Sequence, residues 1–201
     1  MVERSYSRII VGIDPAQSGS IVALVLSGDR AILLFCVAWK KVTRQKRKFY
    51  KVDIFSYDQN YETSILCEHP AMISKKVNDL LCEHTYQFNK IIEDLRLSIA
   101  IEDAYVGRSA KTGIGVAKFA GRIVGVIEGY LNREAMWTSA GGWRKVVLDL
   151  PHFTKREECK KASIERIPAM VEGLPIALRK LGKLDHITDA SGIALWSYLK
   201  K

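Results

Sequence analysis

The sequence predicts an α/β fold in which a mixed β-sheet is flanked by α-helices. The chain opens with closely spaced apolar runs rich in β-branched residues, and further short apolar runs follow at 97–102 and 134–139. Longer segments between and after these runs have the pattern of helices. Three strands, then alternating helices and strands, then further helices form a typical order for a mixed sheet covered by helices.

Length and composition favour one soluble domain over residues 1–201, large enough to bury a sizeable core. Hydrophobic residues make up 48% and charged residues 26%, as is ordinary for a globular protein. No apolar run approaches the roughly 20 residues of a membrane span, and the N-terminus lacks the apolar core of a secretory signal. Four scattered cysteines, Cys36, Cys67, Cys82 and Cys159, favour reduced thiols, so we expect a cytoplasmic protein that does not bind membranes.

The net charge of +9 points to a polyanionic partner, and nucleic acid is the first candidate. The alternative is a basic protein without such a partner, which charge alone does not exclude. No basic amphipathic helix stands out, so binding to a membrane surface is disfavoured.

The first strand covers 8–14, and a turn joins it to a second strand at 21–26. Asp14 ends the first strand. A carboxylate in this position is either solvated at the edge of the turn or bound to a metal ion, and this stretch leaves both alternatives open. A third strand is expected at 31–39.

A basic segment follows at 40–51, where seven of twelve residues are Lys or Arg and two are aromatic. Lysines that protect a solvated strand edge would give a similar pattern. We favour an arm that follows a phosphate backbone, with Arg44, Lys46, Arg47 and Lys48 as DNA-binding candidates. Residues up to about 70 are polar and are expected to be irregular, as a basic insertion or hairpin extension at about 40–70.

The remaining elements alternate. A helix is expected at 71–95, a strand at 97–102 that ends in Glu102, and a loop at 107–115 that carries two further DNA-binding candidates, Arg108 and Lys111. A helix at 116–131, a strand at 134–139, a short helix opened by Trp143-Arg144-Lys145, and helices at 157–171 and 184–199 complete the order.

The helix at 116–131 carries a stripe of small residues four apart, Ala117, Gly121, Gly125 and Gly129. Each glycine inside a helix costs about 1 kcal/mol relative to alanine. The stripe therefore indicates that another backbone approaches closely, either the sheet or the same helix of a second subunit.

Acidic residues recur at the ends of apolar elements. Asp14 and Glu102 end strands, and the last helix carries Asp185, His186 and Asp189, of which residues three or four apart share a face. Converging carboxylates repel each other unless a cation lies between them, and Mg²⁺ or Mn²⁺ favours oxygen ligands of this kind. The alternative is that Asp185 only caps the helix and Asp189 is solvated. The whole set favours a site for two metal ions, which can clamp a phosphodiester.

Three motifs resemble the RuvC Holliday-junction resolvases of the RNase H-like superfamily. They are Val-Gly-Ile-Asp-Pro at 11–15, Ile-Ala-Ile-Glu-Asp-Ala-Tyr at 99–105 and Asp-His-Ile-Thr-Asp-Ala at 185–190. Their order, approximate spacing and expected placement on strand, strand and helix agree with that family. The resemblance implies an RNase H-like fold and a Mg²⁺-dependent endonuclease, able to use Mn²⁺, that acts as a homodimer on four-way junction DNA without a small-molecule cofactor.

The resemblance also implies residue roles. Asp14, Glu102 and Asp189 look like metal-binding carboxylates, His186 looks like the fourth member of the set, and the adjacent Asp185 can substitute. A neutral imidazole at 186 can bind metal or orient water, and a protonated one can support the leaving group.

The resemblance further implies contacts with DNA. Tyr105 lies where RuvC proteins carry an aromatic residue that stacks on a base. Lys145 and either Lys160 or Lys161 resemble basic residues that hold phosphate near the scissile bond. Solvated helix faces for the lysines and a core position for Tyr105 are the structural alternatives.

Two features depart from the family. Ala16 follows Pro15 where the family usually has glycine, and the basic segment with its extension is additional material, which suggests a divergent or phage-type member. Alternatives for function are therefore an RNase H-like nuclease acting on other branched DNA or RNA–DNA hybrids, and a junction-binding protein with a degenerate site.

A repeated Cys-x-His pattern, Cys67 with His69 and Cys82 with His84, is compatible with a tetrahedral zinc site. Residues two apart on a helix point away from each other, which disfavours zinc at Cys82 and His84.

Overall fold

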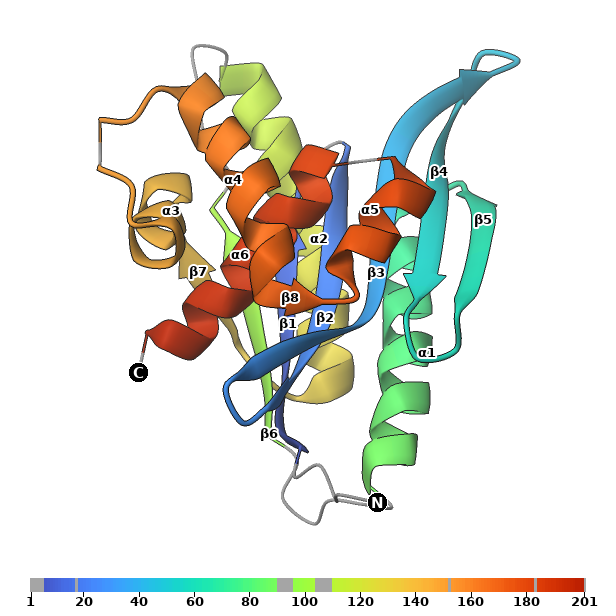
Figure 1. Cartoon of the computed structure of the whole chain (residues 1–201). Coiled ribbons are helices and arrows are strands. Elements are labelled where there is room, and N and C mark those ends of the chain that lie inside the picture. The colour runs from blue at the N-terminus through green and yellow to red at the C-terminus, as the bar shows by residue number, and fades with distance from the viewer. Residues whose placement is uncertain are drawn as a thin grey trace.

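The structure is a computed structural model that describes residues 6–16, 18–89, 96–103, 110–151, 153–182 and 184–200. One mixed sheet of eight strands forms its centre, and helices cover both faces (Figure 1). This architecture confirms the α/β fold class expected from the sequence.

The strands are β1 (Tyr6–Asp14), β2 (Gly19–Ser27), β3 (Arg30–Arg44), β4 (Arg47–Ser56), β5 (Tyr61–Cys67), β6 (Arg96–Glu102), β7 (Ala135–Thr138) and β8 (Val171–Glu172). Their order is β5-β4-β3-β2-β1-β6-β7, and β8 pairs with β3. Strands β1 to β5 form an antiparallel meander, whereas β6 and β7 add to β1 in parallel. Because Ile13 pairs with Ile101 in the parallel ladder, Asp14 and Glu102 end neighbouring strands at the same edge of the sheet.

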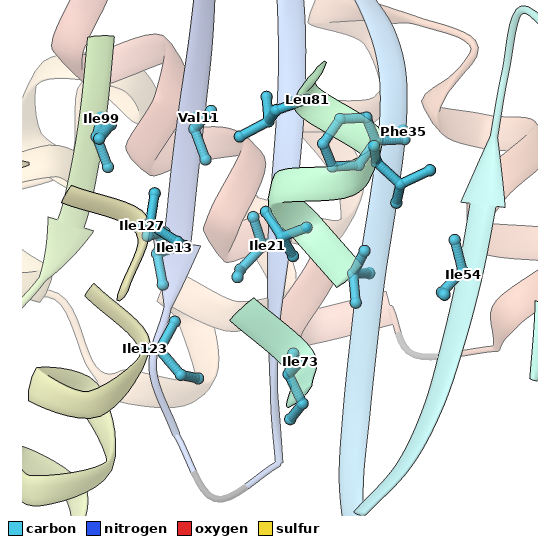
Figure 2. Close-up of a cluster of buried hydrophobic side chains, with 14 of the residues drawn as sticks. Val11, Ile13, Ile21, Phe35, Ile54, Ile73, Leu81, Ile99, Ile123 and Ile127 are labelled. Atoms are coloured by element: carbon cyan, nitrogen blue, oxygen red, sulfur yellow. The ribbon is translucent and has the colours of Figure 1, made fainter. Parts of the chain in front are cut away.

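Two helices, α1 (Pro70–Asn89) and α2 (Ala110–Leu131), cover one face of the sheet. Figure 2 shows Ile73 and Leu81 of α1 and Ile123 and Ile127 of α2 over the strand residues Val11, Ile13, Ile21, Phe35, Ile54 and Ile99. The opposite face packs against α3 (Ala140–Leu148), α4 (Arg156–Met170), α5 (Leu174–Leu181) and α6 (Leu184–Leu199). Strand β1 supplies both cores because alternate side chains point to opposite faces.

Helix α6 lies directly on β1 at Gly12. A methyl group at Gly12 would overlap the backbone carbonyl oxygen of Ala190 and would lie 2.7 Å from the backbone nitrogen of Ala194. The Ser20 hydroxyl on β2 donates a hydrogen bond to the carbonyl oxygen of His186, over 2.8 Å. These contacts fix the start of α6 beside the end of β1.

Several elements differ from the sequence-based expectations. The stretch before residue 70 was expected to be irregular, which is wrong, because β4 and β5 occupy most of it. Along β5, Thr63, Ile65 and Cys67 are less exposed than the residues between them, so the alternation exists but uses few apolar residues. The expected loop at 107–115 is wrong from Ala110 onward, where α2 begins. Strand β8 and helix α5 were not predicted, and the last residues of the helix expected at 71–95 lie outside the described residues.

The glycine stripe of α2 does not face the sheet. No described atom lies within 4 Å of the position that a Cβ would take at Gly121, Gly125 or Gly129, and all three are exposed. The alternative in which the sheet approaches this stripe is therefore wrong.

None of the helices in the described part of the chain is both long and apolar enough to cross a membrane.

Candidate active site

Acidic side chains from two strands and one helix meet at one edge of the sheet. Asp14 ends β1, Glu102 ends β6, and His186 and Asp189 lie one turn apart on α6. The Nδ1 atom of His186 lies 2.7 Å from Oδ2 of Asp14, which joins the helix to the first strand. The three motifs that were far apart in the sequence therefore form one cluster.

Helix α3 supplies hydrogen-bond donors to two of the carboxylates. The Trp143 indole N–H donates to Oε2 of Glu102 over 2.8 Å, and the Arg144 guanidinium donates to Oδ2 of Asp189 over 3.0 Å. Trp143 is fully buried against Gly192 of α6, where a methyl group would overlap the indole ring. The glycine thus lets Trp143 pack closely enough on α6 for its N–H to reach Glu102.

Glu102 and Asp189 carry less negative charge in this cluster than they would in water. Burial, followed by the negative charge of Asp14, raises the pKa of Glu102 to about 7. Burial also raises the pKa of Asp189 to about 6, with Asp14 acting in the same direction and Arg144 in the opposite one. Raised pKa values of neighbouring acids are characteristic of functional sites.

The pKa of His186 is raised as well, but for an imidazole a raised pKa favours the charged form rather than the neutral one. Its hydrogen bond with Asp14 is the main cause that raises the pKa of His186, and the charges of Asp14, Asp185 and Asp189 add to it. Below that raised pKa the ring is an imidazolium that donates from Nδ1 to the Asp14 carboxylate.

The donor set suits a hard divalent cation. Oδ1 of Asp189 is buried without a hydrogen bond of standard geometry, the Ser163 hydroxyl stabilises the carboxylate only in part, and Arg144 binds the other oxygen. A buried carboxylate oxygen without a partner is costly unless a cation or water satisfies it. Among the described residues, no three His, Cys, Asp or Glu side chains are arranged to hold one metal ion as they stand. Asp14, Glu102 and Asp189 each have one oxygen in a hydrogen bond to a protein group, so a metal ion would take their other oxygens or replace those contacts.

Other predicted site residues lie around this cluster. Asp185 accepts hydrogen bonds from Lys160 Nζ over 2.8 Å and from the backbone N–H of His186 over 3.1 Å. Lys145 is exposed on α3, and Lys161 is exposed on α4 with Glu165 3.9 Å away. The structure thus joins Lys160 to the edge of the cluster, whereas Lys161 points to solvent.

The remaining DNA-binding candidates are distributed differently. Lys46, Arg47 and Lys48 are exposed at the tip of the β3–β4 hairpin, where Lys46 has a positive φ of 64°. Tyr105 and Arg108 lie outside the described residues, as do the side chains of Arg44 and Lys111.

Trp143 and Arg144 were not predicted as site residues, whereas Lys145 was. The helical pattern of α3 indicates only which of its residues face inward. Trp143 and Val147 are four apart and buried, and Arg144 lies four residues before the buried Leu148, so Arg144 flanks the inward face. Lys145 lies three residues before Leu148 and is nevertheless exposed, so spacing alone does not separate Arg144 from Lys145.

The two Cys-x-His pairs have different surroundings. Cys67 is buried at the end of β5, and His69 is exposed and accepts a hydrogen bond from the N–H of Ala71. Cys82 is exposed, whereas His84 is fully buried, stacks on Phe35 and lies 3.2 Å from Asp58.

No protein-family model matches the chain, and no curated protein sequence matches it. Among solved structures, the chain is similar to T. thermophilus RuvC in complex with a Holliday junction substrate. The match covers 96% of this chain and 93% of that chain, with 12% sequence identity and a TM-score of 0.55. The chain therefore has the RuvC-like fold that its three motifs lead us to expect.

Proposed function

We propose that this protein is a metal-dependent, structure-selective DNA endonuclease that resolves four-way junctions by paired, symmetric nicks. The observation that carries the proposal is the convergence of Asp14, Glu102 and Asp189 with His186 at one edge of the sheet. The RuvC neighbour bound to a Holliday junction substrate supports the choice of DNA structure.

The carboxylates of Asp14, Glu102 and Asp189 would hold Mg²⁺ or Mn²⁺, with Asp185 at the margin. The metal would supply polarisation of the phosphodiester and a hydroxide nucleophile at neutral pH. His186, held by Asp14, is placed to bind or move a proton at the cluster, and its imidazolium form would stabilise a leaving oxygen. Arg144 is a fixed positive charge beside Asp189 that can contact a phosphate once that carboxylate is otherwise neutralised.

Exposed lysine and arginine side chains continue outward from the edge of the sheet that carries the acidic cluster. Because Gly19, at the start of β2, pairs with Trp39, residues 40–44 of β3 continue past the end of β2 and pair with β4 alone. The resulting hairpin projects beyond the rest of the sheet (Figure 1). Its exposed tip residues Lys46, Arg47 and Lys48, together with Lys145, Lys160 and Lys161, would contact DNA phosphates.

Paired nicks require two active sites, so we propose a homodimer. The exposed face of α2 with Gly121, Gly125 and Gly129 offers a surface on which a second copy can approach closely.

The test is cleavage of a synthetic four-way junction with Mg²⁺ by the wild type and by Asp14→Asn, Glu102→Gln and Asp189→Asn. We expect paired, symmetric nicks by the wild type and a loss of at least about a hundredfold in rate for each variant, because each removes a charged ligand. Junction binding should persist. Asp79→Asn, an exposed carboxylate on α1, is the matched control and should cut normally.

A normal cutting rate for any of the three variants would contradict the site assignment. If the protein cleaves a flap, a duplex or an RNA–DNA hybrid in preference to a four-way junction, then that nucleic acid is its substrate and the junction is not. Junction binding without any cleavage across a metal titration would indicate a binding protein instead.

A further inference from the structure

A second basic site lies between the β3–β4 hairpin and α2, apart from the acidic cluster. It is a pocket of about 260 Å³ lined by Lys41, Tyr50, Pro70, Gly115, Lys118 and Arg122. Lys41 and Tyr50 are directly opposite each other in the hairpin, and the cations of α2 face them from one turn of helix. Lys41 and Tyr50 belong to the basic segment 40–51, whereas Lys118 and Arg122 on α2 were not predicted to bind DNA.

The positive charges of this pocket are not balanced by any carboxylate among the described residues that line it. Lys41, Lys118 and Arg122 are exposed, no carboxylate lines the pocket, and within the described ranges none of the three forms an ion pair. The pocket also reaches Pro70 at the N-terminus of α1, but Pro70 has no N–H, and the N–H groups of Ala71 and Met72 already donate to His69. The three cations around this hollow are therefore what favours an anionic ligand.

Tyr50 adds a hydrogen-bond donor. Burial raises the pKa of the Tyr50 phenol above its ordinary value, and the charge of Arg122 only partly opposes that effect. The hydroxyl therefore stays protonated at neutral pH and can donate to an anionic oxygen.

The size of the pocket limits the ligand. Pockets that enclose a whole small molecule are typically about 300–1,000 Å³, and this one, at about 260 Å³, lies just below that range. A single phosphate group whose neighbours extend into solvent suits it better than an enclosed nucleotide does.

A row of aromatic rings fixes the pocket to the acidic edge of the sheet. The indole N–H of Trp39 donates to the carbonyl oxygen of Ala16, in the turn that follows Asp14, over 3.1 Å. The Trp39 ring packs on Phe119 with centroids 5.8 Å apart, and Phe119 packs on Tyr50 at 5.4 Å. Since Trp39 is fully buried, the pocket and the turn beside Asp14 keep a fixed separation.

We propose that this pocket binds one backbone phosphate of the DNA, at a fixed distance along the strand from the bond cut at the acidic cluster. This inference rests on the proposed nuclease function. The phosphate, held by Lys41, Lys118, Arg122 and the Tyr50 hydroxyl, sets where the DNA lies relative to Asp14.

The test compares Lys118→Ala/Arg122→Ala with the wild type in binding of a four-way junction at several salt concentrations without metal. Loss of one neutralised phosphate should reduce the slope of log K against log salt by about 0.9. Affinity at low salt should fall by about tenfold or more. Tyr50→Phe should weaken binding by a smaller factor and leave the slope unchanged, because it removes a neutral donor.

Arg133→Ala is the matched control, because Arg133 is an exposed arginine just beyond the opposite end of α2. It should leave both affinity and slope unchanged. Gly115 lines the pocket, and a Cβ there would meet open space, so Gly115→Leu adds bulk at the pocket and replaces a helical glycine with a good helix former. It should keep or raise the melting temperature while it weakens junction binding, which separates blocked binding from misfolding.

Wild-type affinity and slope in Lys118→Ala/Arg122→Ala would overturn the inference and leave the nuclease proposal intact. Equal losses in Arg133→Ala would also overturn it, since general charge would then explain the effect. If inorganic phosphate raises the melting temperature of the wild type alone while the slope for DNA is the same in both proteins, the pocket binds free phosphate and the inference is wrong. A wild type that neither binds nor cuts junctions would overturn both proposals.

Discussion

The two oxygens of Asp189 have different surroundings, and this difference shows how the acidic cluster is balanced. Oδ2 accepts from Arg144, while Oδ1 is buried without a hydrogen bond of standard geometry, and the Ser163 hydroxyl stabilises the carboxylate only in part. Arg144 is itself only partly satisfied, because its Nε is buried and unpaired. The guanidinium thus neutralises one carboxylate of a set that carries more acidic groups than it has cations, and the excess is relieved by raised pKa values at Glu102 and Asp189.

These raised pKa values predict how stability depends on pH in the absence of metal. Between about pH 5 and pH 7 the folded protein binds more protons at Glu102, Asp189 and His186 than the unfolded chain does, because each folded pKa lies above its ordinary value. Stability therefore falls as pH rises through this range. Each pKa unit corresponds to about 1.4 kcal/mol, so we expect a loss of a few kcal/mol in the free energy of unfolding.

Urea unfolding at several pH values, with and without Mg²⁺, measures this effect. Mg²⁺ should restore much of the lost stability at pH 7 to 8, because binding to the ionised carboxylates favours the folded state. Glu102→Gln should flatten the pH dependence, since it removes the largest contributor. A metal-free protein whose stability is constant or rises from pH 5 to 7 would contradict the electrostatic account of the cluster.

At the scale of elements, the contact between β1 and α6 determines whether the site exists. Gly12→Ala would force its methyl group into the backbone of α6 at Ala190 and Ala194, which cannot yield as a side chain can. We expect a loss of about 3 kcal/mol or more in stability, at or above the upper end for overpacked cores. The shift of α6 would also move His186 and Asp189 away from Asp14, so metal-dependent cleavage should be lost even where the fold survives.

Gly115→Ala is the matched control for Gly12→Ala, because it makes the same chemical change at a helical glycine that has open space around it and lies outside the glycine stripe. It should raise stability by up to about 1 kcal/mol. Chemical denaturation of both variants measures the difference, and a Gly12→Ala protein as stable as the wild type would show that α6 is not held where the structure places it.

The elements that were predicted correctly can be recognised from the pattern of apolar residues within each of them. Strands β1, β2 and β6 are short, nearly continuous apolar runs, and α6 begins and ends where the sequence indicates. Strand β5 was missed because an edge strand needs apolar side chains on one face only, and Thr63 takes one of those inward places. Helix α4 was predicted despite Pro168, which removes one backbone hydrogen bond but lies in the last turn, so that only two helical residues follow it.

At the scale of the whole molecule, the sequence predicted which acidic residues form the cluster but not what contacts them. Asp14 and Glu102 are brought together by the parallel pairing of β1 and β6, which follows from the order of the elements. The contacts of Trp143 and Arg144 depend on how α3 packs against α6 through Gly192, and no local pattern encodes that packing. Tertiary contacts of this kind are what a single sequence leaves open.

The outer surface of α2 is the proposed contact between two copies of the chain. Gly121, Gly125 and Gly129 each weaken the helix and have no described atom within 4 Å of the place of a side chain, so they serve no packing within the described subunit. If a second copy packs here, Gly125→Leu should dissociate the dimer without destabilising the subunit, because leucine favours helices and meets open space.

Sedimentation velocity should show a dimeric wild type and a monomeric variant, with Asp79→Leu on the exposed face of α1 as the control for added bulk. The monomer should place single rather than paired nicks in a junction, since one subunit carries one acidic cluster. A variant that stays dimeric, or a wild type that is monomeric while it cuts in pairs, would contradict the assignment of this face.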